Sequence, residues 1–199
     1  MARMLKAPDA TDVHKIALKI VNLETKRLVR ISSHQTGEPY FGRAANHRFD
    51  DPEKIYGTCY MGLTLGTAVA ESILHDLEPV DGGYALTPDK VCNTFAHGFS
   101  GGPIRLADLT GAALSRLGAH AEISGTPVYD VTMLWSRAIF EHPDTVDGFQ
   151  YMSRLYTNRK AVVLFDRGTS QTLTKGTSVP LYKHKTYASV RRALHIRLT

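Results

Sequence analysis

Residues 60–73 read Tyr-Met-Gly-Leu-Thr-Leu-Gly-Thr-Ala-Val-Ala-Glu-Ser-Ile, a short apolar run that turns through glycine into a helix. Gly62 is placed to end the strand, and Thr64 is a suitable N-cap because its hydroxyl can accept from an amide of the first helical turn. The apolar positions that follow recur at helical spacing over about residues 65–78. Glu71 lies at the border of that apolar face, about two turns into the helix. It is the first candidate for chemistry.

Strands and helices are predicted on both sides of this stretch, without the regular alternation of a doubly wound fold. Apolar and β-branched runs predict strands at residues 26–32, 58–61, 90–96, 104–107, 149–152 and 160–165. Helices are predicted at residues 65–78, 108–118 and 126–142, with Thr126 and Pro127 opening the last, and residues 16–23 form a short helix or an arm. The alternation of Leu194, Ile196 and Leu198 is typical of an edge strand. The sequence therefore predicts a single α+β domain with interrupted, mostly antiparallel sheets and several helices.

The composition is that of one globular domain: 199 residues, of which 43% are hydrophobic and 22% charged. No apolar run approaches the roughly 18 residues of a membrane span, and the first residues lack the apolar segment of a secretory signal. We therefore expect a cytosolic protein. The two cysteines, Cys59 and Cys92, do not indicate a disulfide framework and are expected to be buried thiols. No spacing of His and Cys indicates a metal site, so no metal is expected.

The C-terminal segment is basic: residues 167–199 carry seven of the 24 Lys and Arg residues and none of the 19 Asp and Glu residues. Such a segment can meet an acidic protein partner, a phosphate-bearing ligand or nucleic acid. A solvated face or an edge strand protected by cations explains the same pattern without a ligand. A non-enzymatic module that binds nucleic acid or protein through this segment is therefore one functional hypothesis. A protein partner is favoured over nucleic acid because only Tyr182 and Tyr187 interleave with the cations as stacking aromatics.

Four further residues are candidates for a site with Glu71, and each alone has an ordinary structural explanation. Arg30 lies within a predicted strand, where an arginine usually extends to solvent, and Arg48 follows a long polar loop. Tyr60 ends an apolar strand, where a tyrosine is more often a core residue than a ligand contact. Ser153 has neither a G-x-S-x-G turn nor a histidine placed beside it by the sequence. Spacing alone therefore favours a solvated helix border for Glu71.

The order of these residues along the chain resembles the RES domain family. The corresponding runs are Arg30, Arg48-Phe49, Tyr60, Thr67-Ala68-Val69-Ala70-Glu71, Asp147-Gly148-Phe149-Gln150-Tyr151-Met152-Ser153 and Val162-Val163-Leu164-Phe165-Asp166. The arginine, glutamate and serine for which the family is named correspond to Arg30, Glu71 and Ser153, and the resemblance covers about residues 26–168. One departure concerns Asp50, because the family's usual Arg-Phe-Asn or Arg-Trp-Asn run here ends in aspartate. The role of position 50 is left open.

This resemblance implies a fold similar to that of ADP-ribosyltransferases and chemistry on NAD as a substrate, without a metal. It implies a bacterial, cytoplasmic toxin that cleaves the nicotinamide–ribose bond as an NAD glycohydrolase or phosphorylase; ADP-ribosyl transfer to a protein is the alternative. The implied partner is an Xre-family helix-turn-helix antitoxin. The toxin would meet operator DNA only indirectly, through this antitoxin. A homodimer is compatible with the resemblance. The domain would span residues 1–199, with its core at about 26–168 and the basic segment 167–199 packed on it.

The residue types suit that chemistry. Nicotinamide is cationic in NAD and leaves as a neutral molecule, so no general acid is required, and the single carboxylate of Glu71 can stabilise an oxocarbenium-like centre. The planar guanidinium groups of Arg30 and Arg48 suit diphosphate oxygens. Tyr60 offers a face for the nicotinamide ring, and Ser153 offers a hydroxyl for its amide or for ribose. The expected catalytic residues are Glu71, Arg30 and Ser153, and the expected NAD-binding residues are Arg30, Arg48, Tyr60 and Ser153.

Overall fold

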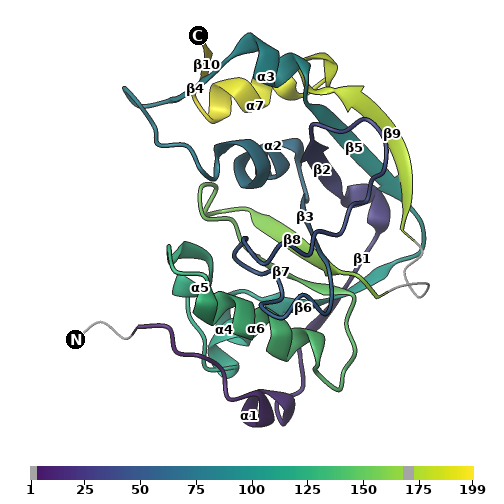
Figure 1. Cartoon of the computed structure of the whole chain (residues 1–199), viewed down its shortest axis with the longest axis vertical. Coiled ribbons are helices and arrows are strands. Elements are labelled where there is room, and N and C mark those ends of the chain that lie inside the picture. The colour runs from purple at the N-terminus through teal and green to yellow at the C-terminus, as the bar shows by residue number, and fades with distance from the viewer. Residues whose placement is uncertain (1–3, 168–172) are drawn as a thin grey trace.

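The computed structural model describes residues 4–167 and 173–199, which fold into a mixed sheet flanked by short helices (Figure 1). The strands are β1 (Ile20–Leu23), β2 (Val29–Ser32), β3 (Thr58–Gly62), β4 (Tyr84–Leu86), β5 (Phe95–Ser100), β6 (Ile104–Leu109), β7 (Gly148–Met152), β8 (Lys160–Phe165), β9 (Thr174–Pro180) and β10 (Ile196–Leu198). The α-helices are α1 (Ala10–His14), α2 (Leu65–Val69), α3 (Pro88–Cys92), α4 (Gly111–Arg116), α5 (Glu122–Gly125), α6 (Asp130–Phe140) and α7 (Tyr187–Ala193). A π-helical turn, η2 (Ala70–Leu74), continues α2, and single 3₁₀ turns are η1 (Thr25–Arg27) and η4 (Leu181–Lys183).

The main sheet has eight strands in the order β1-β6-β7-β8-β3-β2-β5-β9. Neighbouring strands are antiparallel except for the parallel pair β6 and β7. A separate two-stranded sheet pairs β10 with β4 in parallel. The predicted α+β class with mostly antiparallel sheets is therefore confirmed.

The sheet opens between β2 and β3. Their register contains only the pair of Val29 and Gly62, whereas β3 pairs with β8 along its whole length and β2 pairs with β5. Apart from that pair and an isolated bridge between Thr58 and Gly42, the backbone of β3 therefore lacks a partner on this edge in the described part of the chain. The guanidinium of Arg30 satisfies one of the exposed groups, since its NH1 atom donates to the carbonyl oxygen of Tyr60 over 3.1 Å.

Two groups of helices cover different halves of the sheet (Figure 1). Helices α1, α4 and α6 pack on β6, β7 and β8 around buried apolar and aromatic residues that include Trp135, Ile139, Phe149, Val163 and Phe165. Helices α2 and α7 pack on β2 and β5 around Ile31, Leu65, Val69, Ala96 and Tyr187. The opening between β2 and β3 therefore lies between two helix-covered clusters, while a third buried cluster, which includes Met61, Phe99 and Val162, joins the strands on both sides.

The stretch at residues 60–73 folds as a strand, a tight turn and a helix. Gly62 allows the turn because a Cβ atom at this position would lie 2.3 Å from the amide nitrogen of Ala68. The predicted cap is confirmed, since the Thr64 hydroxyl accepts from the Thr67 amide over 3.2 Å. The predicted extent to residue 78 is wrong: α2 widens into η2, and the helix ends at Leu74.

Several other predicted elements differ from the structure. Residues 20–23 form a strand, not part of a helix or an arm, because β1 completes its hydrogen bonds with β6. The predicted strand at residues 90–96 starts with helix α3, which Thr87 caps and Pro88 opens, and only Phe95 and Ala96 belong to a strand. The long predicted helix begins at Asp130, well after Thr126 and Pro127.

The C-terminal segment forms more than the predicted edge strand. Within 173–199 it forms β9, η4, α7 and β10, while residues 168–172 of the predicted basic segment lie outside the described residues. Its buried side chains, including Leu181, Tyr187 and Ile196, join the core around α2. Both cysteines are free thiols, but only Cys59 is buried; Cys92 is exposed, contrary to expectation.

No helix in residues 4–167 or 173–199 combines the length and apolarity required to cross a membrane.

Candidate active site

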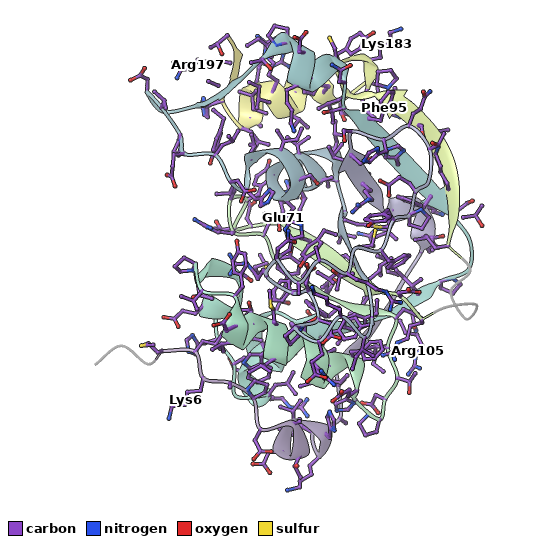
Figure 2. All side chains as sticks on the ribbon, in the orientation of Figure 1. Lys6, Glu71, Phe95, Arg105, Lys183 and Arg197 are labelled. Atoms are coloured by element: carbon purple, nitrogen blue, oxygen red, sulfur yellow. The ribbon has the colours of Figure 1, made fainter. Side chains whose placement is uncertain are left out.

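A cavity of about 250 Å³ opens where β2 and β3 diverge, and Glu71 lies on its wall, near the middle of the molecule (Figure 2). The lining side chains that carry formal charge are Arg30, Arg48, Asp50, Glu71 and Arg154. The lining aromatic side chains are Tyr40, Tyr60, Tyr129 and Tyr151, and His47 and His75 also face the cavity. Residues far apart in the sequence therefore meet around two carboxylates, Asp50 and Glu71, with arginines and aromatic rings beside them.

Both carboxylate oxygens of Glu71 accept hydrogen bonds from neutral hydroxyl groups. Ser153 Oγ donates to Oε1 over 2.6 Å, and Tyr151 OH donates to Oε2 over 2.5 Å. Burial, and then the neighbouring charge of Glu71, holds the pKa of Tyr151 well above its ordinary value of 10.0. The phenol therefore keeps its proton and remains a donor. These two bonds fix the carboxylate while leaving each oxygen with lone-pair capacity for a ligand.

Glu71 lies in η2, the wide turn that continues α2. The preceding residues of α2 are all buried, so the helix is held firmly against the sheet up to Val69. A π turn then adds a residue to the helical turn and changes the direction of the side chains that follow. Such turns are common at functional sites, and here the turn carries the carboxylate that faces the cavity.

Arg30 projects from β2 into the opening of the sheet. Its Nε atom forms an ion pair with Glu38 Oε2 at 2.6 Å, and the two side chains expose only 16% and 1% of their surface. The same guanidinium donates to the Tyr60 carbonyl oxygen. Glu38 also accepts from the Tyr40 amide over 2.9 Å. Two contacts therefore hold Arg30 at the cavity, the ion pair with Glu38 and the hydrogen bond to Tyr60, and the Tyr40 amide fixes Glu38 in turn.

Arg48 reaches the cavity from the long loop between β2 and β3. Its guanidinium donates to the Thr126 carbonyl oxygen over 2.5 Å and lies 4.8 Å from the centre of the Tyr129 ring. Burial lowers its pKa, and the nearby Arg154 adds to this effect, whereas Tyr129 and Glu71 oppose it. Arg48 is thus a partly desolvated cation on the cavity wall.

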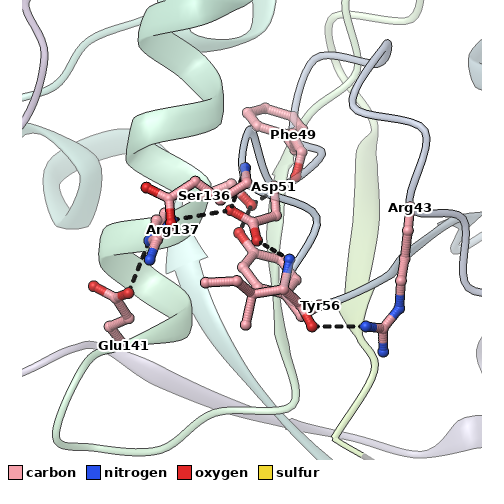
Figure 3. Close-up of polar contacts among 9 residues, drawn as sticks. Arg43, Phe49, Asp51, Tyr56, Ser136, Arg137 and Glu141 are labelled. Atoms are coloured by element: carbon pink, nitrogen blue, oxygen red, sulfur yellow. Dashed lines mark hydrogen bonds and ion pairs between the residues drawn. The ribbon is translucent and has the colours of Figure 1, made fainter.

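Helix α6 holds the loop that carries Arg48 (Figure 3). Thr132 donates to the Arg48 carbonyl oxygen over 2.6 Å, and Ser136 donates to that of Phe49 over 2.7 Å. Further along the same helix, Arg137 forms ion pairs with Asp51 at 3.5 Å, with Glu53 at 2.8 Å and with Glu141 at 2.8 Å. The position of Arg48 therefore depends on contacts between two segments that the sequence separates by about eighty residues.

Tyr60 and Asp50 form a second fixed pair at the cavity. The Tyr60 hydroxyl accepts from the Phe49 amide over 2.8 Å and donates to Asp50 Oδ1 over 3.3 Å. Asp50 also accepts from the Thr58 hydroxyl over 2.6 Å and from the His47 amide over 3.1 Å. The aspartate that departs from the family pattern therefore organises the loop, and the Tyr60 ring is left to line the cavity.

The structure places the predicted site residues in two groups. Arg30, Arg48, Tyr60 and Glu71 line the cavity, whereas Ser153 is 1% exposed and lies behind Glu71. Tyr151 was not predicted as a site residue. Its signal was nevertheless present in the sequence, because residues two apart on an extended segment project to the same side, and Tyr151 stands two residues before Ser153.

In residues 4–167 and 173–199, no cluster of three or more His, Cys, Asp or Glu side chains is arranged to hold a metal ion.

The sequence and the fold of the chain were compared with those of known proteins. The RES domain family model matches residues 27–183. A chain from the crystal structure of the M. tuberculosis MbcT–MbcA toxin–antitoxin complex superposes with a TM-score of 0.66 at 13% sequence identity, covering 92% of this chain and 96% of that chain. None of the curated protein sequences compared with the chain is similar to it. The structural likeness shows the fold, and the family match covers more than half of the chain.

Proposed function

The chain belongs to the RES domain family, and from this premise we propose that it is an NAD-consuming toxin that cleaves the bond between nicotinamide and ribose. The observation that carries the proposal is the environment of Glu71. Its carboxylate lies on the wall of a cavity, both its oxygens are fixed by hydroxyl donors, and arginines line the same space. A carboxylate held in this way is already oriented before a positive charge develops beside it.

The proposed reaction breaks the bond between C1′ of the ribose and the pyridinium nitrogen of NAD. The bonding electron pair goes to the ring nitrogen, so nicotinamide leaves as a neutral molecule and no side chain has to protonate it. Positive charge develops on C1′ and the ring oxygen of the ribose, where the carboxylate of Glu71 stabilises it and can accept from a ribose hydroxyl. An acceptor oxygen or nitrogen then attacks C1′ and releases its proton.

The other lining residues have roles that follow from their chemistry. Arg30 and Arg48 present planar guanidinium groups that suit the diphosphate of NAD, and the partial burial of both strengthens such contacts. The ring of Tyr60 offers a flat surface for nicotinamide. Ser153 does not line the cavity, and we assign it to holding Glu71, not to touching NAD.

We also propose that a cognate antitoxin neutralises the protein. MbcT, a structural neighbour, is the toxin of a toxin–antitoxin complex. The sequence resemblance implies that the antitoxin is an Xre-family helix-turn-helix protein. Co-purification of the chain with the product of an adjacent reading frame of that type would test the partner separately from the reaction.

Nicotinamide release tests the proposed reaction. The purified protein is incubated with NAD in buffer, in phosphate and with cell lysate, and mass spectrometry identifies the product. Free ADP-ribose indicates water as the acceptor, its 1″-phosphate indicates phosphate, and a modified lysate protein indicates ADP-ribosyl transfer. Glu71→Gln keeps the shape of the side chain but removes its charge, and it should lower the rate by about a hundredfold. If no acceptor supports nicotinamide release, or if Glu71→Gln reacts at the full rate, the proposal is wrong.

A further inference from the structure

A second cavity, of about 350 Å³, lies at the end of the molecule that carries α3, η4, α7 and β10, and it shares no residue with the Glu71 cavity. Figure 2 shows Lys183 and Arg197 at this end and Glu71 nearer the middle. The polar residues of its lining are His184, Lys185, Tyr187 and Arg191. The proposed reaction at Glu71 gives this cavity no role.

The cavity lies in the basic segment of the chain. Residues 173–199 contain no Asp or Glu, so the segment supplies no side-chain carboxylate to its own cations. Within this segment, Arg197 forms an ion pair with Asp81. Among the described residues, neither Lys185 nor Arg191 has a carboxylate partner. Burial, and then the charge of Lys185, lowers the pKa of His184. Two cations without counter-charges therefore face one cavity.

Tyr187 adds a buried donor to the same lining. Its side chain is 6% exposed, and its hydroxyl is buried without a hydrogen-bond partner among the described residues. Burial raises the pKa of this phenol, so it keeps its proton. A buried hydroxyl without a partner is unfavourable, and natural proteins leave few such groups unless a ligand or water satisfies them. An anionic oxygen that reached this hydroxyl from the cavity would accept its hydrogen bond.

The remaining wall is mostly apolar, with the free thiol of Cys92 as its further polar group. Pro88, Val91 and Leu198 contribute aliphatic surface, and the ring of Tyr182 is 48% exposed beside them. A small inorganic anion would leave this surface unused, whereas a planar ring joined to a phosphate would contact both walls. Phosphate is favoured over a carboxylate because it offers more oxygens and more charge to the cations.

We propose that this second cavity is a binding site for a small phosphorylated ring compound of the nucleoside monophosphate class. Arg191 and Lys185 contact the phosphate, Tyr187 donates to one of its oxygens, and the ring lies against Tyr182 and the aliphatic wall. The volume of the cavity falls within the range of small-molecule sites. This proposal does not depend on the reaction proposed for Glu71.

Calorimetric titration of the whole chain with AMP tests the site, and two adjacent arginines provide a matched pair. Arg191 lines the cavity, whereas Arg192 donates to Ser189 and does not line it. Arg191→Ala should weaken AMP binding by about tenfold or more, as expected for a lost charge-assisted hydrogen bond, and Arg192→Ala should change it by less than about twofold. Tyr187→Phe removes only the hydroxyl and should weaken binding several-fold, and adenosine should bind much more weakly than AMP.

Three outcomes would overturn the proposal. Equal weakening by Arg191→Ala and Arg192→Ala would show a diffuse basic surface, of the kind that meets nucleic acid or an acidic protein and weakens steeply with salt. Loss of AMP binding in Arg48→Ala, with Arg191→Ala unaffected, would place the nucleotide in the Glu71 cavity. If the chain is normally folded and still does not bind AMP at millimolar concentration, the proposed site is also rejected.

Discussion

Ser153 lies directly behind Glu71, with its Oγ atom 2.6 Å from Oε1 of the glutamate. The Oγ atom of Ser153 also accepts a hydrogen bond from the Tyr156 amide over 3.2 Å, so the serine hydroxyl directs its proton toward the Glu71 carboxylate. The main chain at this position is also fixed, because the Ser153 amide donates to the Arg159 carbonyl oxygen over 2.9 Å. The serine of the family signature is therefore part of the support of the glutamate in this chain.

Ser153→Ala should lower kcat by about tenfold and leave KM for NAD nearly unchanged. The variant removes one charge-assisted hydrogen bond to Glu71, and bonds of this kind are worth about 1.5–3 kcal/mol. It removes no group from the cavity lining. Steady-state kinetics and thermal unfolding, measured together, separate this effect from a loss of fold. A rise in KM without a change in kcat would instead indicate that Ser153 contacts the substrate directly.

Tyr151→Phe should have a similar effect through the other oxygen of Glu71. The phenylalanine keeps the buried ring and removes only the hydroxyl that donates over 2.5 Å. We expect kcat to fall by about tenfold, since a single charged hydrogen bond is lost. Tyr56→Phe is the matched control, because that hydroxyl bonds to Ser136 away from the cavity; it should alter stability but not kcat. If both variants reduce kcat equally, the tyrosine at 151 has no special role.

The local elements around Glu71 could be predicted because their signals lie close together in the sequence. Thr64 as an N-cap, Gly62 as the turn and the apolar run of β8 each act within a few residues. Thr87 and Pro88 carry the same kind of local signal for α3, although the pattern of residues 90–96 favours a strand. In contrast, β1 is a strand because it pairs with β6, more than eighty residues away, and no local pattern in residues 16–23 reports that pairing.

The candidate site was predictable in part of its composition but not in its geometry. Four of the predicted site residues line the same cavity: Arg30, Arg48, Tyr60 and Glu71. Their roles in the reaction remain predictions. The wide turn at Glu71 and the divergence of β2 from β3 arise from packing between distant elements. Hydrophobic periodicity cannot show either feature, because it reports the spacing of apolar residues along one segment and not the contacts between distant segments.

Arg30→Ala should both destabilise the fold and impair NAD use, and a second variant separates the two effects. Without Arg30, the carboxylate of Glu38 is left 1% exposed and without its cation, which should lower the free energy of unfolding by about 3 kcal/mol. Replacing both residues, as Arg30→Met with Glu38→Gln, removes the uncompensated charge and should restore most of that stability. KM for NAD should remain raised in the double variant. Recovery of normal kinetics there would show that Arg30 acts only through the fold.

Cys59 and Cys92 should differ in reactivity and in their effect on stability at high pH. Cys59 is 0% exposed, and burial raises the pKa of its thiol from an ordinary value of 9.0 to about 12, whereas Cys92 is exposed. A thiol reagent at pH 8 should therefore label Cys92 rapidly and Cys59 only after unfolding. Rapid labelling of both thiols in the native protein would contradict the burial of Cys59.

The same shift in the pKa of Cys59 sets the direction of a stability change with pH. Between about pH 9 and pH 12 the unfolded chain loses this proton while the folded chain retains it, so the unfolded state binds fewer protons and the free energy of unfolding falls as pH rises. The contribution is fully present below pH 9, and its loss approaches about 1.4 kcal/mol for each pH unit within that window. Cys59→Ala should unfold more easily than the parent at pH 8, because it leaves a small cavity. That difference should shrink steadily in denaturant titrations between pH 8 and pH 10.5, and a constant difference would show that the thiol titrates alike in both states.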